Sequence, residues 1–117
     1  MVKLENEAGS ICISTDVFTW LAGDAATRCF GVKGMAALTK ENGLVQLLRR
    51  ESMSKGVVVR SNDDGSISIE LHIVVDHGVN LATLSGSIMN EVSYKVSSAT
   101  NVPVSRVDVF IDSMIMD

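Results

Sequence analysis

Residues 55–79 read KGVVVRSNDDGSISIELHIVVDHGV and predict a β-hairpin more clearly than any other stretch of the chain. Two runs rich in β-branched residues flank Asn62-Asp63-Asp64-Gly65, and the glycine supplies the positive φ that such a turn needs. A three-residue loop, 63–65, pairs Asn62 with Ser66. The alternation of apolar and polar residues then fixes which side chains share a face.

The predicted register gives the hairpin one apolar face and one mixed face. It pairs Val57 with Leu71 and Val59 with Ile69. The apolar face gathers Val57, Val59, Ile67, Ile69, Leu71, Ile73 and Val75. The other face carries Val58, Arg60, Ser68, Glu70, His72 and Val74. A slip of one residue would expose the apolar set to water, so we expect the rest of the chain to cover that face.

Length and composition indicate one domain over residues 1–117, with an ordered core of about 9–112. Hydrophobic residues make up 46% of the chain but aromatic residues only 4%, so the core must consist of aliphatic side chains. No apolar run is long enough to span a membrane, and the first ten residues lack the apolar segment of a signal peptide. Two cysteines without metal-site spacing suit a reducing compartment, which favours the cytoplasm.

The first third of the chain predicts a strand followed by a helix. Residues 1–8 are polar and expected to fray, whereas Gly9–Ile13 alternates as a strand does. Ser14 is a helix N-cap. The inward stripe of this helix is Val17, Phe18, Leu21, Ala22, Ala25 and Cys29, with Gly23 off the stripe. Trp20 lies off its centre, either flat along the helix flank or exposed as an anchor for a partner.

Two further segments flank the hairpin. Leu44–Glu51 fits two turns of amphipathic helix with Leu44, Leu47 and Leu48 inward. After the hairpin, Asn80 can cap a helix that runs to about Thr100, with Asn101 as a left-handed C-cap. Its inward stripe is Leu81, Leu84, Ile88, Val92, Val96 and Ala99.

A last strand, 104–111 or slightly longer, points Arg106, Asp108, Phe110 and Asp112 outward. The predicted order is therefore β-α-β-β-α-β, with a short extra helix in the first α-β connection. Two helices covering one face of a sheet of about four strands make an α+β two-layer sandwich. The split β-α-β arrangement is the natural topology for this order.

The residues that usually carry chemistry do not converge in the sequence. His72 and His77 are five positions apart and face opposite sides of a continuous strand, which excludes a shared metal ion. No serine-nucleophile motif is present. Of the outward residues only Phe110 is an aromatic on which RNA bases would stack. We therefore expect no enzyme activity and no catalytic, cofactor or metal site.

Positive charge is concentrated between residues 40 and 60. This segment holds five basic and two acidic residues, a net +3, which leaves −7 for the rest of a chain of net charge −4. It is either a solvated patch or a docking surface for an acidic partner or anionic headgroups. The candidate contacts are Arg49, Arg50, Lys55 and Arg60, together with Trp20 and Phe110. Nucleic-acid binding would rest on the same segment, and the overall acidity disfavours it.

Several segments, in order, resemble a known family. ICIS at 11–14, LAGDAA at 21–26 and GVKGM at 31–35 are similar to the N-terminal half of the alkaline-shock/general-stress (Gls-type) proteins of Gram-positive bacteria. The stretches 42–59 and 69–81 resemble its short YloU-like members. The resemblance covers about 9–112.

The resemblance implies a non-enzymatic role in the cell envelope. Larger members of the family are cytoplasmic proteins held at the membrane by a small anchoring protein and linked to envelope stress. Genes of the YloU-like group often lie beside that of a fatty-acid kinase. The resemblance therefore implies a stress-response scaffold that acts through protein contacts, with self-association as an option. The alternative is a regulatory accessory protein of fatty-acid metabolism partnered with the kinase, and a second alternative is a small nucleic-acid-binding domain.

Overall fold

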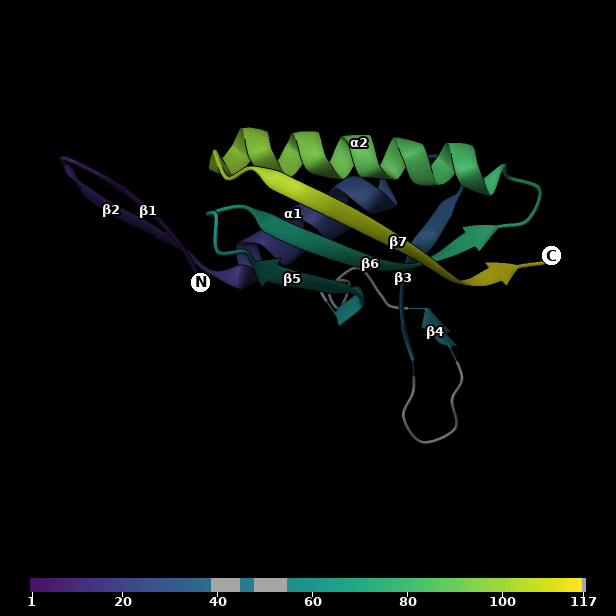
Figure 1. The fold of residues 1–117 in the computed structure, drawn as a ribbon. Coiled ribbons are helices and arrows are strands. Elements are labelled where there is room, and N and C mark those ends of the chain that lie inside the picture. Colours follow the sequence, from purple (N-terminus) through teal and green to yellow (C-terminus); the bar gives the residue numbers. More distant parts are fainter. Residues whose placement is uncertain (39–44, 48–54, 117) are drawn as a thin grey trace.

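A computed structural model of the protein describes residues 1–38, 45–47 and 55–116. Two helices lie on one face of a β-sheet, which confirms the predicted α+β sandwich (Figure 1). The helices are α1 (Thr15–Thr27) and α2 (Leu81–Thr100). The strands are β1 (Val2–Asn6), β2 (Gly9–Ile13), β3 (Val32–Leu38), β4 (Val45–Leu47), β5 (Val57–Ser61), β6 (Ile67–Asp76) and β7 (Val104–Ile115).

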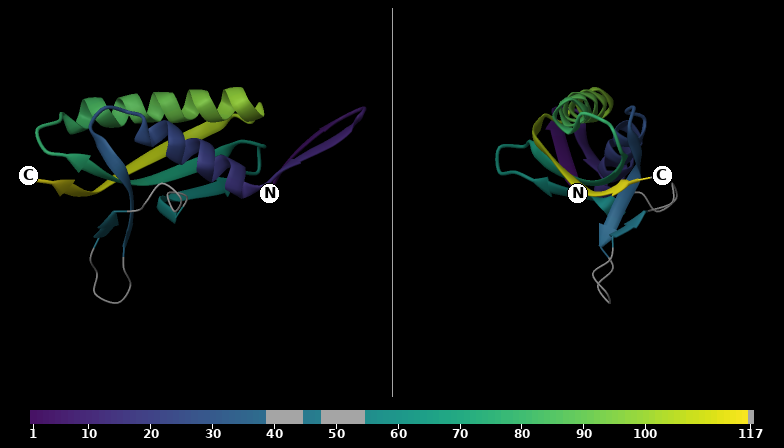
Figure 2. Two further views of the ribbon diagram at one scale, coloured as in Figure 1. Left: turned by 180° about the vertical axis from the view of Figure 1, so that it is seen from behind. Right: turned by 90° about the vertical axis from the view of Figure 1, so that its right-hand side faces the viewer.

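Strand β6 is the centre of the main sheet. The order is β4-β3-β6-β5, and β7 pairs with β6 as well. Strands β3 and β5 are antiparallel to β6, whereas β7 is parallel to it. A parallel neighbour requires a long crossover, and α2 provides it between β6 and β7. Both helices lie on the same face of the sheet (Figure 2). No helix of the described residues covers the opposite face, termed the open face, although Val74 on that face is buried.

The hairpin of β5 and β6 has the predicted register. Val57 pairs with Leu71 and Val59 with Ile69, and the Asn62 amide donates to the Ser66 carbonyl oxygen at 2.8 Å. Gly65 adopts a φ of 88°, as its place in the turn requires. Ile69 and Leu71 are buried, and Glu70 between them lies on the opposite face. The apolar alternation thus faces both helices.

The core is mostly aliphatic, as the composition predicts, and it also contains the aromatic ring of Phe18. Its largest fully buried side chains are Phe18, Met35, Ile67, Ile69, Leu71, Ile73, Ile88, Val75, Val92, Val96 and Val102. Helix α2 begins at the Asn80 cap, which accepts from the Thr83 amide, and ends at Asn101 with a φ of 58°. Both caps are where the sequence predicts them.

The N-terminal prediction was wrong in two respects. Residues 2–6 do not fray but form β1, and Gly9–Ile13 is a strand that pairs with β1 instead of joining the main sheet. The two strands form a separate hairpin that extends from the body (Figure 1). The alternation of Gly9–Ile13 showed that it is a strand but carried no information on its partner.

The predicted short helix at 44–51 was also wrong where the structure describes it. Val45–Leu47 is strand β4, paired with β3, and Leu47 is about half exposed. The other residues of that segment lie outside the described residues. The helical spacing in this stretch rested on one short apolar run, and a run of that length is also compatible with a strand.

The inward stripe of α1 is rotated relative to the prediction. Val17 is exposed, whereas Gly23 and Asp24 are buried together with the predicted Phe18, Ala22 and Ala25. Cys12 is exposed because β2 lies outside the body. At the two ends of α2, Leu81 and Ala99 are exposed, and the stripe between them is buried as predicted.

Candidate protein-contact surfaces

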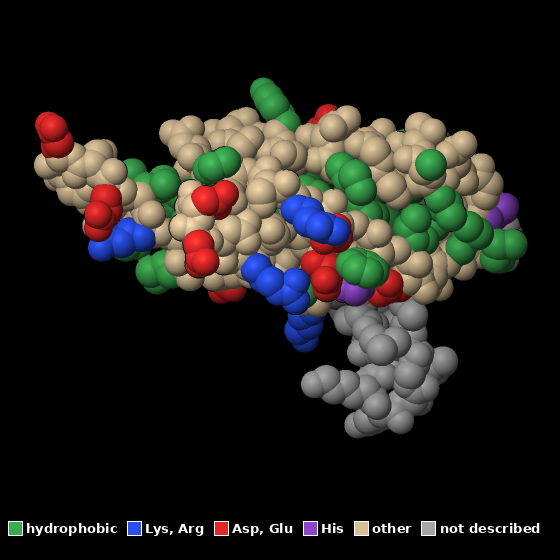
Figure 3. Space-filling view, in the orientation of Figure 1, with side chains coloured by type: hydrophobic (Ala, Val, Ile, Leu, Met, Phe, Trp, Pro, Cys, Tyr) green, Lys and Arg blue, Asp and Glu red, His purple; other side chains and the backbone are tan. Residues whose placement is uncertain are grey.

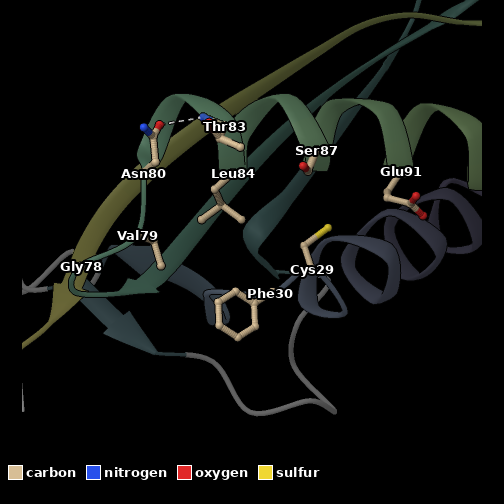
Figure 4. A pocket seen from close by; sticks show the side chains of 9 residues that line it. All are labelled: Cys29, Phe30, Gly78, Val79, Asn80, Thr83, Leu84, Ser87 and Glu91. Carbon is tan, nitrogen blue, oxygen red and sulfur yellow. Dashed lines mark hydrogen bonds between the residues drawn. The ribbon is translucent and has the colours of Figure 1, made fainter.

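A groove of about 560 Å³ separates the end of α1 from the first half of α2. Cys29 and Leu84 point into this space from opposite sides (Figure 4). The lining residues are Cys29, Phe30, Gly78, Val79, Asn80, Thr83, Leu84, Ser87 and Glu91. The groove therefore has an apolar floor and a rim of short polar side chains from α2.

Backbone geometry holds the groove in shape. Gly31 adopts a φ of 98°, and a Cβ at this position would lie 2.9 Å from Val79 Cγ1. The Gly31 carbonyl oxygen accepts a hydrogen bond from the Asp76 amide at 2.9 Å. The Asn80 side chain caps α2 at the groove's end by accepting from the Thr83 amide at 3.0 Å (Figure 4). Glycine at position 31 thus lets the α1–β3 connection lie against the α2 side.

The side chain of Phe30 is 94% exposed at the rim of this groove. Such exposure of a large aromatic beside an apolar groove is typical of interaction sites. Glu91 is the charged side chain in the groove lining. It forms no ion pair with another of the described residues. Burial, followed by the negative charge of Glu91, raises the pKa of the Cys29 thiol, which therefore stays protonated at neutral pH.

The two basic side chains near the groove in sequence, Arg28 before Cys29 and Lys95 one turn after Glu91, are already paired with Asp24. Arg28 Nε lies 3.1 Å and Lys95 Nζ 2.7 Å from Asp24 Oδ2, whose side chain is only 2% exposed. Because this buried carboxylate holds both cations, neither is paired with Glu91. As lined by the described residues, the groove is therefore apolar and carries the unpaired negative charge of Glu91.

The open face of the sheet carries a second cluster, centred on His72. The imidazole Nδ1 lies 2.9 Å from Asp112 Oδ2, and Nε2 lies 2.9 Å from Glu70 Oε2. Burial lowers the pKa of His72, but the hydrogen bonds and charges of Glu70 and Asp112 outweigh it, so the pKa is raised overall. Phe110 stacks on the imidazole with ring centroids 4.9 Å apart. The cluster ties β7 to β6.

The sequence-predicted contact residues are distributed over this open face and elsewhere. Phe110 and Arg60 lie on it, as predicted, and both are exposed. Lys55 is exposed in the turn before β5, and Arg49 and Arg50 lie outside the described residues. Acidic and basic side chains gather around a histidine near the lower edge of the body in Figure 3. The role of the basic segment as a docking surface stays a prediction.

Trp20 lies on α1 and is half exposed. Neither histidine belongs to a cluster that could hold a metal ion within residues 1–38, 45–47 and 55–116. His77 follows the end of β6, where its Nδ1 lies 3.3 Å from the Ile115 carbonyl oxygen. None of the helices in the described part of the chain is long and apolar enough to cross a membrane.

Sequence reasoning missed the groove and the His72 cluster for different reasons. Phe30 follows the helix end and falls off its stripe, a signal that marks it as exposed. The groove itself depends on how α1 packs beside α2. Asp112 meets His72 only because β7 lies beside β6, which required the strand order.

Comparison with known proteins identifies the family. The profile of the family of alkaline shock protein 23, described as having a cell envelope-related function, matches residues 3–116. The chain belongs to this family. Its membership confirms the resemblance found in the sequence and supports a cell-envelope-related role.

Two relatives match along nearly their whole lengths. The chain is 31% identical to the uncharacterized protein YloU of Bacillus subtilis over 114 residues, which are 97% of this chain and 94% of that protein. It is 34% identical to an uncharacterized protein of Streptococcus pyogenes serotype M6, covering 97% and 93% of the two chains. The likeness to the short YloU-like members is thus confirmed.

A solved structure shares the fold. The C-terminal domain of MamM, in a variant described as its manganese form, superposes with a TM-score of 0.50 at 16% identity. The match covers 86% of this chain and 99% of the MamM domain. At this identity the likeness concerns the fold alone.

Proposed function

We propose that this protein is a non-enzymatic scaffold of the cell envelope that acts by binding other proteins. The observation that carries the proposal is the groove between α1 and α2, with the 94% exposed ring of Phe30 at its rim. An exposed aromatic beside an apolar cavity is the arrangement found at the centre of protein interfaces. Family membership supplies the envelope context.

The groove suggests the chemistry of the partner. Leu84 and Val79 favour an apolar side chain, and the uncommitted carboxylate of Glu91 favours a lysine or arginine nearby. A protein segment that presents one apolar and one basic side chain fits both features. A membrane-anchoring protein of the envelope is the first partner to test, and it would bring a cytoplasmic protein to the membrane.

Capture from an envelope fraction tests this function with three forms of the protein. Phe30→Ser removes the exposed ring, and Tyr94→Ser is the matched control because Tyr94 is 73% exposed on α2 outside the groove. We expect a protein that wild type and Tyr94→Ser retain and Phe30→Ser loses, with an unchanged melting temperature. Identical captures by all three forms would remove the groove from the function.

Charge reversal at the rim provides an independent measurement on the captured protein. Glu91→Lys should weaken its binding, mainly by slowing association, and the loss should be larger at low salt. Asp63→Lys, at an exposed position in the turn before β6 and at the opposite end of that strand from the groove, is the matched reversal and should leave that binding unchanged. Equal effects of the two reversals would indicate a response to net charge instead of a defined contact.

A lipid-linked accessory role is the second candidate. The groove volume of about 560 Å³ and its apolar floor lie within the range of small-molecule sites. Fatty-acid kinase activity measured with and without the protein decides between the two roles. If the protein changes the kinase rate and Phe30→Ser abolishes that change, the accessory role is favoured. If the protein leaves the kinase rate unchanged, the scaffold role is favoured.

A further inference from the structure

The hairpin of β1 and β2 lies mostly outside the packed body of the protein. It extends from the body, and Val2, Leu4 and Ile13 contact the core near its base. Its outer half, residues 5–11, is exposed, including Ile11 at 55%. A two-stranded hairpin is marginally stable in water, and three or more strands are needed for independent stability. The outer edge of β1 has no strand partner among the described residues.

The backbone of β1 dictates which residues are available to a new strand. Glu7 and Ala8 form a two-residue connection, so Asn6 and Gly9 next to it exchange hydrogen bonds. Along β1, every second residue bonds to β2 in this way. The amide and carbonyl groups of Lys3 and Glu5 therefore point to the open edge.

Only one register of β1 against itself satisfies both the backbone and the charges. An antiparallel pair must place outward-bonding residues opposite one another. Centring the pair on Lys3 sets lysine against lysine, and centring it on Glu5 sets glutamate against glutamate. Centring it on Leu4 sets Lys3 of each copy against Glu5 of the other. This register therefore forms two cross-strand pairs of opposite charge, which are favourable.

We propose that β1 pairs in antiparallel fashion with β1 of a second copy, with Leu4 of both copies on a two-fold axis. Lys3 Nζ already lies 2.8 Å from Glu5 Oε1 within one strand, so the four charges would form a closed ring on one face. This self-association involves neither the groove nor any other partner, and it stands independently of the proposed function.

The pairing also improves the apolar face of the hairpin. Leu4 and Ile11 are cross-strand neighbours. Two hairpins joined at β1 form four strands, and these two residues from both copies make one continuous apolar row across them. Because a single pair of short strands buries less than about 1,000 Å², the dimer should be weak and depend on concentration.

Sedimentation velocity over a range of concentrations tests the charge register. Lys3→Glu brings four carboxylates together and Glu5→Lys brings four ammonium groups together, so each variant should dimerise about tenfold more weakly than wild type. An equimolar mixture of the two variants restores a lysine opposite each glutamate and should dimerise like wild type. The proposal would be overturned if wild type stayed monomeric at every concentration. It would also be overturned if the mixture dimerised no more strongly than either variant alone.

A disulfide across the axis tests the position of the two-fold. In the proposed register the two Leu4 residues form a non-hydrogen-bonded pair with Cα atoms about 4.5 Å apart, within reach of a disulfide. Leu4→Cys in a Cys12→Ser, Cys29→Ser background should give a covalent dimer on oxidation. Lys3→Cys in that background is the matched control and should link at least tenfold more slowly. Faster linking through position 3 would contradict the register, whatever partner the groove binds.

Discussion

Asp24 Oδ2 lies 2.7 Å from Lys95 Nζ and thereby joins the two helices through a carboxylate that is only 2% exposed. Asp24 stands among the small residues of α1, where Ala22, Ala25 and Ala26 let the helix approach its neighbours. A buried carboxylate is costly without partners, so this contact fixes how α1 lies beside α2. The same packing closes the floor of the groove.

The first prediction concerns this ion pair. Lys95→Met should lower the free energy of unfolding by about 2–3 kcal/mol, because it removes a cation from a buried carboxylate. Arg28→Met is the control: Arg28 also contacts Asp24, but its side chain is 68% exposed, and we expect a loss of about 1 kcal/mol or less. Urea unfolding of both variants measures the difference. Equal losses would show that burial of Asp24 does not set the strength of the contact.

The second prediction concerns pH. The pKa of His72 is raised above its ordinary value of 6.5, so the stability from its contacts is fully present below that pH. It is lost as the pH rises through the folded-state pKa. Asp112→Asn weakens one of the two charged contacts and should reduce this pH dependence, with an effect of about 1 kcal/mol or less at low pH.

Denaturant unfolding between pH 5 and 8, combined with an NMR titration of the His72 ring, checks the pH prediction. The upper limit keeps the Cys29 thiol protonated in both states, because its ordinary pKa of 9.0 applies to the unfolded chain and burial raises the pKa further in the folded protein. His77→Gln, at an exposed position, is the control. A slope unchanged in both variants would mean that the His72 cluster makes no net contribution.

The third prediction compares one substitution at two glycines. A Cβ at Gly86, inside α2, would meet no atom within 4 Å, so Gly86→Ala should stabilise the protein by about 1 kcal/mol through helix propensity. A Cβ at Gly65 also meets nothing, but its φ of 88° disfavours alanine. Gly65→Ala should therefore destabilise by about 1–2 kcal/mol. Melting temperatures that move in the same direction would contradict this account.

The fourth prediction concerns the close approach of Gly56 to β3. A Cβ there would lie 2.9 Å from the Ala36 carbonyl oxygen and 2.9 Å from Met35 Cβ. Because both contacts involve atoms of a buried strand, Gly56→Ala should cost about 1–3 kcal/mol. Thermal unfolding measures the loss, and an unchanged melting temperature would show that β5 can shift away from β3 at no cost.

The sequence by itself determined the local structure of the hairpin and of α2. Alternation from Val57 to Val75 fixed both faces and the register, because a slip would expose the whole apolar set. Asn80 and Asn101 fixed the ends of α2, because capping depends on residues adjacent in the chain. These features involve neighbours in sequence or a short turn.

Tertiary structure alone decided which strands and side chains meet. Gly9–Ile13 alternates like a strand of the main sheet, yet it pairs with β1, because periodicity does not specify a partner. His72 and Asp112 are 40 residues apart and meet through the parallel pairing of β6 with β7. Likewise, Phe30 and Glu91 line one groove only because the Asp24–Lys95 contact and the packed alanines hold α1 against α2.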